Sequence, residues 1–497
     1  MSAQRLDQLL EGVADPAASA GILVTGLSLD SRRAREGDAF FALRGTREHG
    51  IAFAAGAVAN GARVVLAEAP APAGAPALDV PVLWIDGLRA QVGPIAARFF
   101  GRPSAAMRVI GVTGTNGKTS TVQLLAQALA FLGHRAATIG TLGAGLHGRL
   151  NEGERTTPDP ISVQALLADF RAEGASHVAM EVSSHALEQE RVAGVDFEVA
   201  AFTNLTRDHL DYHGSMQAYG AAKARLFAWP GLKAAAVNVD DAFGRTLAGR
   251  LPAGVRVLRL SAAGDAAADV VAREVTTSAE GIAFELRTPW GAGSVRSALL
   301  GRFNVSNLLA VAACLGALGE PFERIAQALA SLRPIDGRMN RLGGRGGLPL
   351  AVVDYTHTPD ALEQALAALR AHCAGRLICV FGCGGERDAG KRPQMGAIAE
   401  RLADVAIVTD DNPRGEDGDA IVAQIVAGMA RPGAARVERD RAVAIRLALA
   451  QARAGDVVLI AGKGHETYQE GAAGKRPFDD LAVARAALDD FHTEQHA

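Results

Sequence analysis

The sequence has few cysteines and a small net charge, and each of these features argues against a class of protein. Its 497 residues include four cysteines, Cys314, Cys373, Cys379 and Cys383. Their spacing fits no zinc-binding pattern, and a chain of this length needs no disulfide framework, so we expect reduced thiols. The formal net charge is −3 and no long basic run occurs. This argues against nucleic acid or an anionic membrane as the main partner.

Long apolar runs are also missing. No uncharged apolar run approaches the roughly 20 residues that span a membrane. Acidic residues lie in the first 16 positions, where a signal peptide would carry its apolar core. We therefore expect a cytoplasmic protein without membrane insertion. The length predicts about three domains at roughly 150 residues each, and a hydrophobic content of 49% allows each to bury a core.

The most informative stretch is 107–120, which reads MRVIGVTGTNGKTS. An apolar run predicts a buried strand, the glycines that follow predict a turn, and apolar residues at helical spacing begin at Val122. In such a layout glycine N–H groups and the helix N-terminus face a phosphate, Lys118 reaches the β/γ-phosphates and the Thr119 hydroxyl binds Mg²⁺. The strict motif has glycine where this chain has Val112.

Glycine- and proline-rich joints at 99–104 and 331–338 predict three segments: 1–103, 104–332 and 333–497. Strand and helix patterns alternate along all three, which predicts an α/β fold with largely parallel sheets. In the first segment the expected elements are strands at 63–66 and 80–85 and a helix at 51–59. In the second they are strands at 177–182, 197–202 and 234–239.

Polar clusters follow these strands of the second segment, where ligands of parallel sheets bind. They begin at Glu181, Thr203 and Asn238. Glu181, Asp208 and His209 close to a phosphate loop are compatible with Mg²⁺, which prefers oxygen ligands beside the phosphates it bridges. Lys223, taken alone, has the pattern of a surface lysine.

The third segment is the most regular. Strands are expected at 350–355, 377–381, 405–409 and 457–461, and helices at 360–372, 394–402, 420–430 and 442–453. Polar loops at 382–388, 410–414 and 462–466 each follow one of these strands. Because carboxyl ends of parallel strands meet at one edge, the three loops predict a shared site.

Nine motifs together resemble those of the Mur ligases, the ATP-dependent amino-acid-adding ligases of peptidoglycan synthesis. They are TGTNGKT at 113–119, EVSSHAL at 181–187, TNLTRDHLDYHG at 203–214, AKARLF at 222–227, GRFNVSN at 301–307, DYTHTPDAL at 354–362, FGCGGERDAGKRP at 381–393, DDNPR at 410–414 and AGKGHE at 461–466. The resemblance implies an N-terminal UDP-binding domain, a central P-loop domain that binds ATP, and a C-terminal Rossmann-like domain that binds the incoming amino acid.

The resemblance also implies a reaction. ATP would phosphorylate the D-Glu side chain of UDP-N-acetylmuramoyl-L-Ala-D-Glu, and the amine of meso-diaminopimelate would attack the acyl phosphate, leaving an amide, ADP and phosphate. A carboxylate is a poor acyl donor, so it needs a leaving group, and phosphoryl transfer then depends on positioning and charge neutralisation. The expected cofactor is Mg²⁺, and we expect a monomer.

The resemblance assigns roles to individual residues. The ATP phosphates would bind Gly114, Thr115, Asn116, Gly117, Lys118, Thr119 and Ser120, and the rest of ATP would bind Asn304, Asn307, Arg338 and Asp354. Mg²⁺ would bind Thr119, Glu181, His209 and Lys223, the lysine as a carbamate formed with CO₂; Lys118, Glu181, His209 and Lys223 would be catalytic. Of the UDP-sugar-dipeptide, the uridine part would bind Leu29, Ser31, Thr46, Arg47 and Glu48, and the muramoyl-dipeptide part would bind Thr156, Thr157, Ser183, Gln189 and Arg191. Diaminopimelate would bind Arg387, Asp411, Asn412, Pro413, Arg414, Gly462 and Glu466.

Three positions depart from the family pattern. Arg155 replaces Asn, Thr356 replaces Ala and Asn340 replaces Glu. An L-lysine-adding ligase of the same family is the nearest alternative and would differ at Arg414. Folylpolyglutamate synthase shares the phosphate loop but not the uridine-type first domain. A nucleotide-dependent switch of the GTPase type would carry an [NT]-K-x-D motif, which the sequence lacks.

Overall fold

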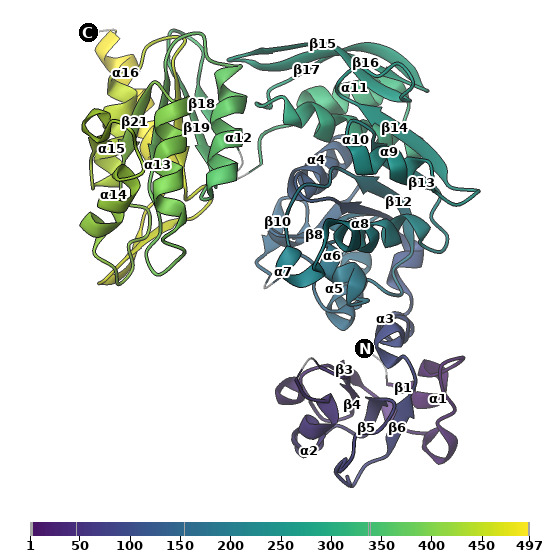
Figure 1. Cartoon of the computed structure of the whole chain (residues 1–497). Helices are drawn as coiled ribbons and strands as arrows, with labels where there is room; N and C mark the ends of the chain where they lie inside the picture. The colour runs from purple at the N-terminus through teal and green to yellow at the C-terminus, as the bar shows by residue number, and fades with distance from the viewer. Residues whose placement is uncertain (1–2, 46, 154, 336, 338, 496–497) are drawn as a thin grey trace. The chain divides into compact units, whose positions relative to one another are not determined.

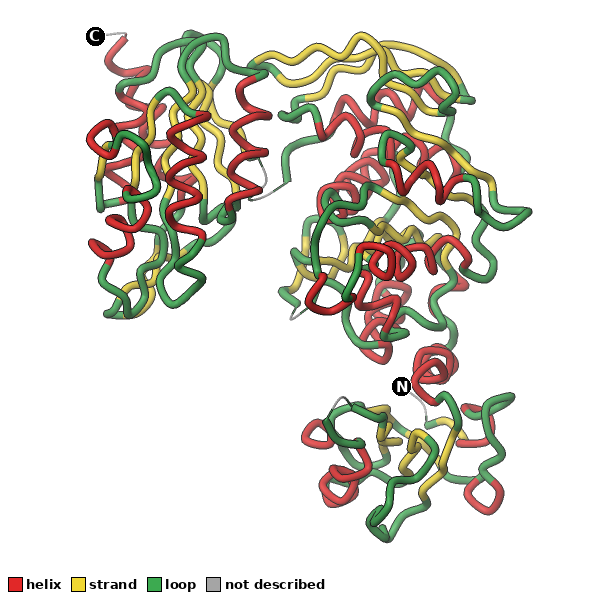
Figure 2. The backbone as a smooth tube through the Cα atoms, in the orientation of Figure 1, coloured by secondary structure: helices red, strands yellow, loops and turns green. Residues whose placement is uncertain are grey.

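The computed structural model describes residues 3–45, 47–153, 155–335, 337 and 339–495. The chain forms two compact units, Met1–Leu260 with Ala310–Glu320, and Ser261–Leu309 with Pro321–Ala497. Helices and strands alternate along both units (Figures 1 and 2). The expected α/β class with largely parallel sheets is confirmed.

The first unit begins with a small parallel sheet of order β3-β4-β5-β6. Successive residues of a strand face opposite sides of the sheet. Phe41 and Leu66 therefore pack with α1 and α3, whereas Phe40 and Val65 pack with α2. The elements of this region are β1 (Gln4–Arg5), α1 (Leu6–Leu9), β2 (Leu23–Val24), β3 (Gly26–Ser28), β4 (Asp38–Ala42), α2 (Ala54–Ala59), β5 (Val64–Glu68), β6 (Val82–Ile85) and α3 (Leu88–Phe99).

A larger sheet in the same unit has the order β10-β9-β8-β11-β7-β12-β13-β14. Its strands are parallel except β9 and β10, which add an antiparallel hairpin at one edge. The strands are β7 (Arg108–Thr113), β8 (Ala136–Gly140), β9 (Gly143–Leu146), β10 (Arg149–Asn151), β11 (His177–Glu181), β12 (Phe197–Phe202), β13 (Ala234–Asn238) and β14 (Arg256–Ser261). Strand β7 lies between β11 and β12, and all three are parallel. The segments that follow these three strands therefore lie together at the carboxyl edge of the sheet.

In the described residues, α-helices connect these strands. They are α4 (Lys118–Phe131), α5 (Pro160–Ala172), α6 (Ser184–Glu188), α7 (Leu210–His213), α8 (Met216–Ala224) and α9 (Ala242–Ala248). Side-chain caps fix several of their starts. Asp159 accepts hydrogen bonds from two N–H groups of α5, and Pro160 takes its first position.

The second unit starts with three antiparallel strands, β15 (Val270–Ser278), β16 (Gly281–Thr288) and β17 (Gly291–Ser297). Helix α11 (Phe322–Ser331) packs on β17, since a Cβ at Gly291 would lie 2.7 Å from Phe322 Cγ. Helix α10 (Phe303–Ala317) begins in the second unit and ends in the first.

The C-terminal sheet has the order β18-β19-β23-β20-β21-β22 and is parallel except for β18. Alternation along its strands places Val352 and Cys379 with helices α12 to α14, which lie in front of the strands in Figure 1, and Val353 and Val380 with α15 and α16. The chain runs outward from β20 to β21 and β22, then returns with β23 beside β20. The loops after β20 and β23 therefore flank the reversal point, where open α/β sheets bind ligands.

The strands of this region are β18 (Asn340–Gly343), β19 (Leu350–Asp354), β20 (Leu377–Phe381), β21 (Val405–Val408), β22 (Arg436–Val437) and β23 (Val457–Ala461), with a separate hairpin of β24 (Tyr468–Gly471) and β25 (Gly474–Pro477). The helices are α12 (Pro359–Arg370), α13 (Lys391–Leu402), α14 (Gly418–Val426), α15 (Arg441–Ala450) and α16 (Asp480–Gln495).

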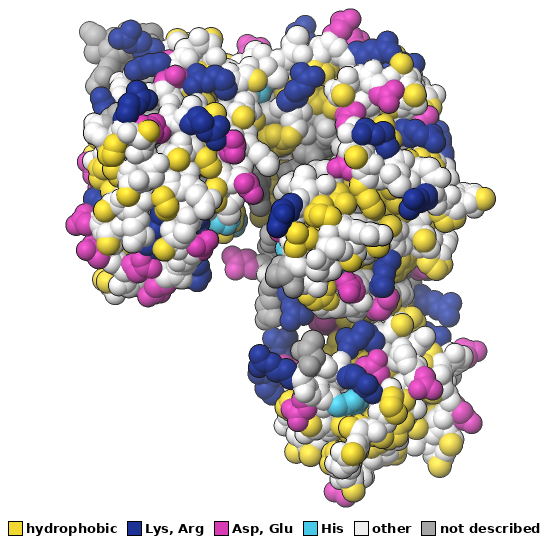
Figure 3. Space-filling model, viewed as in Figure 1, with side chains coloured by type: hydrophobic (Ala, Val, Ile, Leu, Met, Phe, Trp, Pro, Cys, Tyr) yellow, Lys and Arg dark blue, Asp and Glu magenta, His cyan; other side chains and the backbone are white. Residues whose placement is uncertain are grey.

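The surface mixes charges of both signs. Figure 3 shows lysine and arginine side chains interspersed with aspartate and glutamate over the face in view. The whole sequence has 51 basic and 54 acidic residues, so this mixture reflects its near balance of charge. Within the part of the chain that the structure describes, no helix is both long enough and apolar enough to traverse a lipid bilayer.

Candidate active site

The glycine loop between β7 and α4 is shaped by the segment after β12. Gly114 has a φ of +150°, and a Cβ there would lie 1.9 Å from Thr203 Oγ1, so a larger residue does not fit. Thr115 N donates to the Asn204 carbonyl at 2.8 Å. Gly117 precedes the first residue of α4, a helix of 14 residues. The loop thus lies at a helix N-terminus, where main-chain N–H groups suit a phosphate.

The remaining loop residues flank this turn. Asn116 N donates to Asn204 Oδ1 at 2.9 Å. Thr119 and Ser120 lie in the first turn of α4. The seven residues expected to bind the ATP phosphates therefore form one continuous loop and helix start.

Two lysine side chains converge on the Gly114 carbonyl. Lys118 Nζ donates to the carbonyls of Gly114 at 3.0 Å and Thr115 at 2.9 Å, and Lys223 Nζ donates to that of Gly114 at 2.7 Å. Lys223 is 1% exposed, and burial together with the charge of Lys118 lowers the pKa of Lys223 to about 6. The ring of Tyr219 covers Lys223 Nζ at 4.4 Å, and its hydroxyl lies 3.2 Å from Thr115 Oγ1. At neutral pH the Lys223 side chain is therefore mainly an uncharged amine.

Glu181 ends β11 and is 1% exposed. Its carboxylate accepts hydrogen bonds from Thr141 N at 2.8 Å and from Thr141 Oγ1 at 3.3 Å, and Thr119 provides another. Burial raises the pKa of Glu181, while the charge of Lys118 and these hydrogen bonds oppose the rise. A carboxylate and a hydroxyl thus meet beside the glycine loop.

His209, the remaining side chain expected to bind the metal, lies beside Tyr219, the residue that covers Lys223, with ring centroids 6.0 Å apart. Its Nε2 lies 3.4 Å from Asp208 Oδ2, and its ring centroid lies 4.8 Å from that of His185. Among the described residues, no three His, Cys, Asp or Glu side chains are grouped so that they could hold a metal ion. The donors that do meet, Glu181 and Thr119, are oxygens of the kind Mg²⁺ takes when it shares its coordination with phosphates.

The five residues expected to bind the sugar-dipeptide lie close to Glu181: Thr156, Thr157, Ser183, Gln189 and Arg191. Thr157 Oγ1 donates to the Glu181 carbonyl at 2.8 Å and accepts from Ser183 N at 3.2 Å. Arg191 donates to the Thr157 carbonyl at 3.0 Å and to Gln189 Oε1 at 2.6 Å. The structure therefore joins four of them in one network.

Thr156 joins this network through Thr141, because their hydroxyl oxygens lie 3.0 Å apart. The adjacent Arg155 is exposed. Burial, and then the charge of Arg155, lowers the pKa of Arg191. The residue that departs from the family pattern thus adds a second positive charge near the expected dipeptide site.

The expected uridine contacts lie in the small N-terminal sheet. Leu29 and Ser31 follow β3, and the exposed Arg47 and Glu48 follow β4, its parallel neighbour. Both groups therefore lie at the carboxyl edge of that sheet. Thr46 lies outside the described residues.

Three loops of the C-terminal sheet meet as predicted. Asn412 Nδ2 donates to Glu466 Oε2 at 2.9 Å, and the buried Lys463 Nζ donates to Asn412 Oδ1 at 3.0 Å and to Glu466 Oε2 at 2.9 Å. Burial opposes the charged form of Glu466, but the hydrogen bonds from Lys463 and Asn412 outweigh it and lower its pKa. Gly462 has a φ of +126°, and a Cβ there would lie 2.3 Å from Asp411 Oδ2, so the loops touch at a point that only glycine fits.

Arg414 and Arg387 flank the glycine pair after β20. A Cβ at Gly384 would lie 3.0 Å from Arg414 Nη1 and 3.8 Å from Arg387 Cγ. Arg414 donates from Nη1 to the Gly385 carbonyl at 2.8 Å, which is part of a tight contact between that glycine and Pro413. The seven residues expected to bind diaminopimelate therefore lie on three loops that contact one another.

A buried ion pair lies next to the loop that begins at Gly462. Arg441 at the start of α15 and Asp480 at the start of α16 are both fully buried, with Nη2 and Oδ2 2.7 Å apart. Arg441 Nη2 also donates to the Ala461 carbonyl at 3.0 Å, directly before Gly462. Removing either partner would leave an uncompensated charge in the core, which is strongly destabilising.

The remaining expected ATP contacts lie in the second unit. Asn307 Nδ2 donates to Asn304 Oδ1 at 2.8 Å, and both side chains are buried. Asp354 ends β19 and accepts from Met339 N at 2.8 Å and from the Thr356 hydroxyl. Its carbonyl accepts from Gly462 N at 3.1 Å, so Asp354 adjoins the expected diaminopimelate loops. Arg338 lies outside the described residues.

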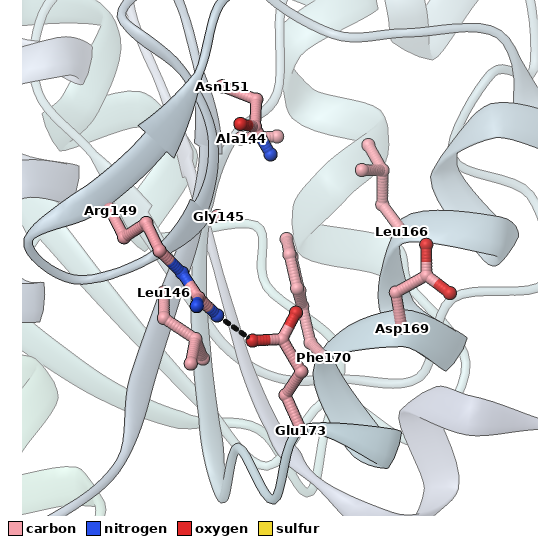
Figure 4. A pocket seen from close by; sticks show the side chains of 9 residues that line it. All are labelled: Ala144, Gly145, Leu146, Arg149, Asn151, Leu166, Asp169, Phe170 and Glu173. Atoms are coloured by element: carbon pink, nitrogen blue, oxygen red, sulfur yellow. Dashed lines mark hydrogen bonds and ion pairs between the residues drawn. The ribbon is translucent and has the colours of Figure 1, made fainter.

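A hollow of about 570 Å³ lies elsewhere, between the β9–β10 hairpin and α5 (Figure 4). Phe170 and Leu146 contribute apolar lining, and an ion pair between Arg149 and Glu173 spans it. None of the expected site residues lines this hollow.

Several contact residues had no role assigned from the sequence. Thr141 holds Glu181, Tyr219 covers Lys223, Lys463 joins Asn412 to Glu466, and Glu470 pairs with Arg414 at 3.2 Å. Lys463 lies within the motif AGKGHE at 461–466, and Tyr219 lies shortly before the motif AKARLF at 222–227. Their closeness to these motifs could have indicated that both residues belong to the site. Thr141 and Glu470 carry no sequence signal that separates them from surface residues.

Open α/β sheets with a glycine loop between a strand and a helix are typical of nucleotide-binding α/β proteins. Three family descriptions match the chain: "Mur ligase family, catalytic domain" at 23–100, "Mur ligase middle domain" at 112–315 and "Mur ligase, glutamate ligase domain" at 337–464. The chain belongs to the Mur ligase family, whose members are ATP-dependent ligases, and the resemblance found in the sequence is confirmed.

The chain is also similar to individual named proteins and to a solved structure. A protein of Xanthomonas campestris pv. campestris (strain 8004) named UDP-N-acetylmuramoyl-L-alanyl-D-glutamate–2,6-diaminopimelate ligase is 60% identical over 486 residues, or 98% of this chain and 97% of its own. One of the same name from Xylella fastidiosa (strain 9a5c) is 57% identical over 94% of each chain. A solved structure of a ligase with this name is 37% identical, with a TM-score of 0.79 over 99% of this chain and all of its own.

Proposed function

We propose that this protein joins meso-2,6-diaminopimelate to the D-Glu carboxylate of UDP-N-acetylmuramoyl-L-Ala-D-Glu, with ATP cleaved to ADP and phosphate. The observation that carries the proposal is the meeting of Asp411, Asn412, Arg414 and Glu466 on touching loops at the reversal point of the C-terminal sheet. Relatives of 57–60% identity that bear the corresponding name support it.

The proposed organisation has three domains, 1–103, 104–332 and 333–497, for the uridine nucleotide, ATP and the amino acid respectively. The three family matches at 23–100, 112–315 and 337–464 support this division. We propose a monomer as the active form. ATP and a nucleotide-linked substrate imply that the reaction takes place in the cytoplasm.

In the first half-reaction the glycine loop would bind the ATP phosphates through its N–H groups and the start of α4. Lys118 would turn from the loop carbonyls that it now contacts toward the β/γ-phosphates. Mg²⁺ would be held by Thr119 and Glu181, with His209 and modified Lys223, and would supply charge neutralisation for phosphoryl transfer. The Thr157, Ser183 and Arg191 network would hold the dipeptide so that its D-Glu carboxylate oxygen attacks the γ-phosphorus and ADP leaves.

Lys223 has the chemistry that carbamate formation requires. A neutral amine adds to CO₂ to form a carbamate and release one proton, and the lowered pKa of Lys223, about 6, keeps the amine neutral at pH 7. The product would be an oxygen-donating anion in place of a neutral amine, close to Lys118, which contacts the same Gly114 carbonyl. We propose this modification for the active protein.

In the second half-reaction the acidic groups Asp411 and Glu466 would bind ammonium groups of diaminopimelate, and Arg414 would bind its distal carboxylate. Arg414 can do so with two parallel hydrogen bonds. One of the two ammonium groups would lose a proton to solvent, and its nitrogen would form a bond to the acyl carbon. The tetrahedral intermediate would expel phosphate, and the nitrogen would lose a second proton to leave the amide. L-Lysine lacks the distal carboxylate and would leave Arg414 facing a cation.

The test is ADP release from the full chain with the uridine-linked dipeptide and ATP, with meso-diaminopimelate or L-lysine in parallel. The proposal predicts rapid ADP release with diaminopimelate and little with lysine, and a product whose mass increases by one diaminopimelate residue. Preference for lysine would assign the chain to the lysine-adding branch. Phosphate release that needs no amino acid would instead indicate a nucleotide switch.

A further inference from the structure

Arg414 is held by the hairpin strand β24 rather than by its own loop. Its φ is +53°, a left-handed conformation that non-glycine residues rarely adopt. Its main-chain N donates to the Glu470 carbonyl at 3.0 Å. Glu470 N donates in turn to Asn412 Oδ1 at 2.9 Å, and Gln469 Nε2 donates to the Asp411 carbonyl at 2.8 Å. Consecutive residues of β24 thus fix the main chain and side chains of the segment from Asp411 to Arg414.

The guanidinium of Arg414 is held at two of its nitrogens, Nε and Nη1. Nε donates to Glu470 Oε2 at 3.2 Å, and Nη1 donates to the Gly385 carbonyl at 2.8 Å. Within the described residues Nη2 donates no hydrogen bond, and the side chain is 19% exposed. A guanidinium carries five N–H groups in a rigid plane. The hydrogen bonds from Nε and Nη1 therefore determine where the N–H groups of Nη2 point.

We propose that Glu470 is a positioning residue for amino-acid selection, which aims the Nη2 end of Arg414 at the distal carboxylate of the incoming diamino acid. This inference rests on the proposed function, because it requires Arg414 to bind that carboxylate. Glu470 acts through Arg414 and does not itself bind substrate.

The physical reason is preorganisation. A free arginine side chain has many rotamers, and binding must restrict them at a cost in affinity. The Nε contact to Glu470 and the strained main chain of Arg414 remove most of that freedom before the amino acid arrives. The same geometry works against L-lysine, because a rigid guanidinium cannot turn away from the lysine ammonium.

The test compares Glu470→Ala with Glu470→Gln in the full-length protein. A glutamine side-chain oxygen can still accept from Arg414 Nε, whereas alanine cannot. Lys475→Ala is a matched control, because Lys475 lies opposite Glu470 in the hairpin and contacts the Tyr468 ring at 4.1 Å instead of the Asp411 to Arg414 segment. Steady-state kinetics would be measured with each substrate varied in turn.

Glu470→Ala is expected to raise KM for diaminopimelate by about 10-fold to 100-fold, the effect of losing one hydrogen bond to a charged group. Its kcat and its KM for ATP and for the uridine-linked dipeptide should change little. Selectivity for diaminopimelate over lysine should fall by a similar factor. Glu470→Gln should lie within a few-fold of wild type, and Lys475→Ala should match wild type.

Three results would overturn the inference: an unchanged KM for diaminopimelate in Glu470→Ala, equal losses in Glu470→Ala and Glu470→Gln, or parallel changes in the KM of all substrates. The second would indicate that charge acts rather than position, and the third a structural role. Failure of the proposed function itself is distinguished by wild type alone, which would then not prefer diaminopimelate.

Discussion

Lys223 Nζ and Lys118 Nζ donate to the same main-chain oxygen, the carbonyl of Gly114, at 2.7 Å and 3.0 Å. Two basic groups on one acceptor repel each other when both are charged, and the charge of Lys118 contributes to the lowered pKa of Lys223. The glycine loop therefore couples the proposed phosphate contact to the proposed site of carbamate formation. A ligand that draws Lys118 toward phosphates would also change the surroundings of Lys223.

Lys118→Ala should abolish ADP release while leaving the fold intact. The substitution removes the cation that the proposed mechanism places at the β/γ-phosphates, where charge neutralisation dominates phosphoryl transfer. Circular dichroism and thermal unfolding would verify the fold. A folded variant with near wild-type turnover would show that the glycine loop does not bind ATP as proposed.

Lys223→Met should stabilise the first unit while removing activity. The folded-state pKa of Lys223 is about 6, against 10.5 for an ordinary lysine. Between these values the unfolded chain binds a proton that the folded chain does not, so the free energy of unfolding rises with pH from about 6 to about 10. The variant should lose this slope and gain most stability near pH 6.

Urea unfolding in CO₂-free buffer at pH 6 and pH 9 would measure both effects. Lys233→Met is the matched control, because the Lys233 side chain is 72% exposed. A pH slope in Lys223→Met that equals or exceeds that of wild type would contradict the assigned ionisation state.

Arg414→Ala should lower kcat/KM for diaminopimelate by roughly 30-fold to several thousand-fold, which corresponds to the loss of about 2–5 kcal/mol for one buried charged contact. Activity with lysine should fall less or rise slightly, since the repulsive guanidinium is gone. Competition between the two amino acids, with products separated by mass, gives the ratio directly. An unchanged ratio would remove Arg414 from selectivity.

His177→Gln should make the first unit less sensitive to acid. Burial, followed by the charges of His134 and Arg108, lowers the pKa of His177 to about 4. As pH falls from 6.5 to about 4 the unfolded state gains the proton first, so wild type loses up to about 3 kcal/mol of stability in this window. Acid titration of the unfolding free energy would show a shallower decline in the variant. The exposed His357, replaced in the same way, serves as the control.

Strong local patterns predicted much of the fold. The expected strand at 377–381 coincides with β20, and that at 197–202 with β12, because apolar runs of five or six residues bounded by polar loops have few alternatives in an α/β chain. The hairpin of β24 and β25 was not predicted. Its strands have four residues each and contain Gly471, Gly474 and Lys475, which are uncommon in strands.

The candidate site could likewise be predicted in part from the sequence. The three loops around Arg414 follow predicted strands, so their meeting could be expected from the rule for parallel sheets. Glu470 lies 56 residues from Arg414, and no periodic pattern links them. The burial of Lys223 could not be predicted either, because it depends on how α8 packs near the Gly114 carbonyl.

The buried pair of Arg441 and Asp480 has a consequence for how this protein is made. Asp480 is translated after every residue proposed to bind a substrate, so until then Arg441 lacks its ion-pair partner and has only the more distant charges of Asp411 and Glu466. Chains fold from the N-terminal side during synthesis, and the first unit and most of the C-terminal sheet can form early. Docking of helix α16 brings Asp480 to Arg441, which holds the carbonyl next to the turn at Gly462. Competence to select an amino acid should therefore be the last property that the nascent chain acquires.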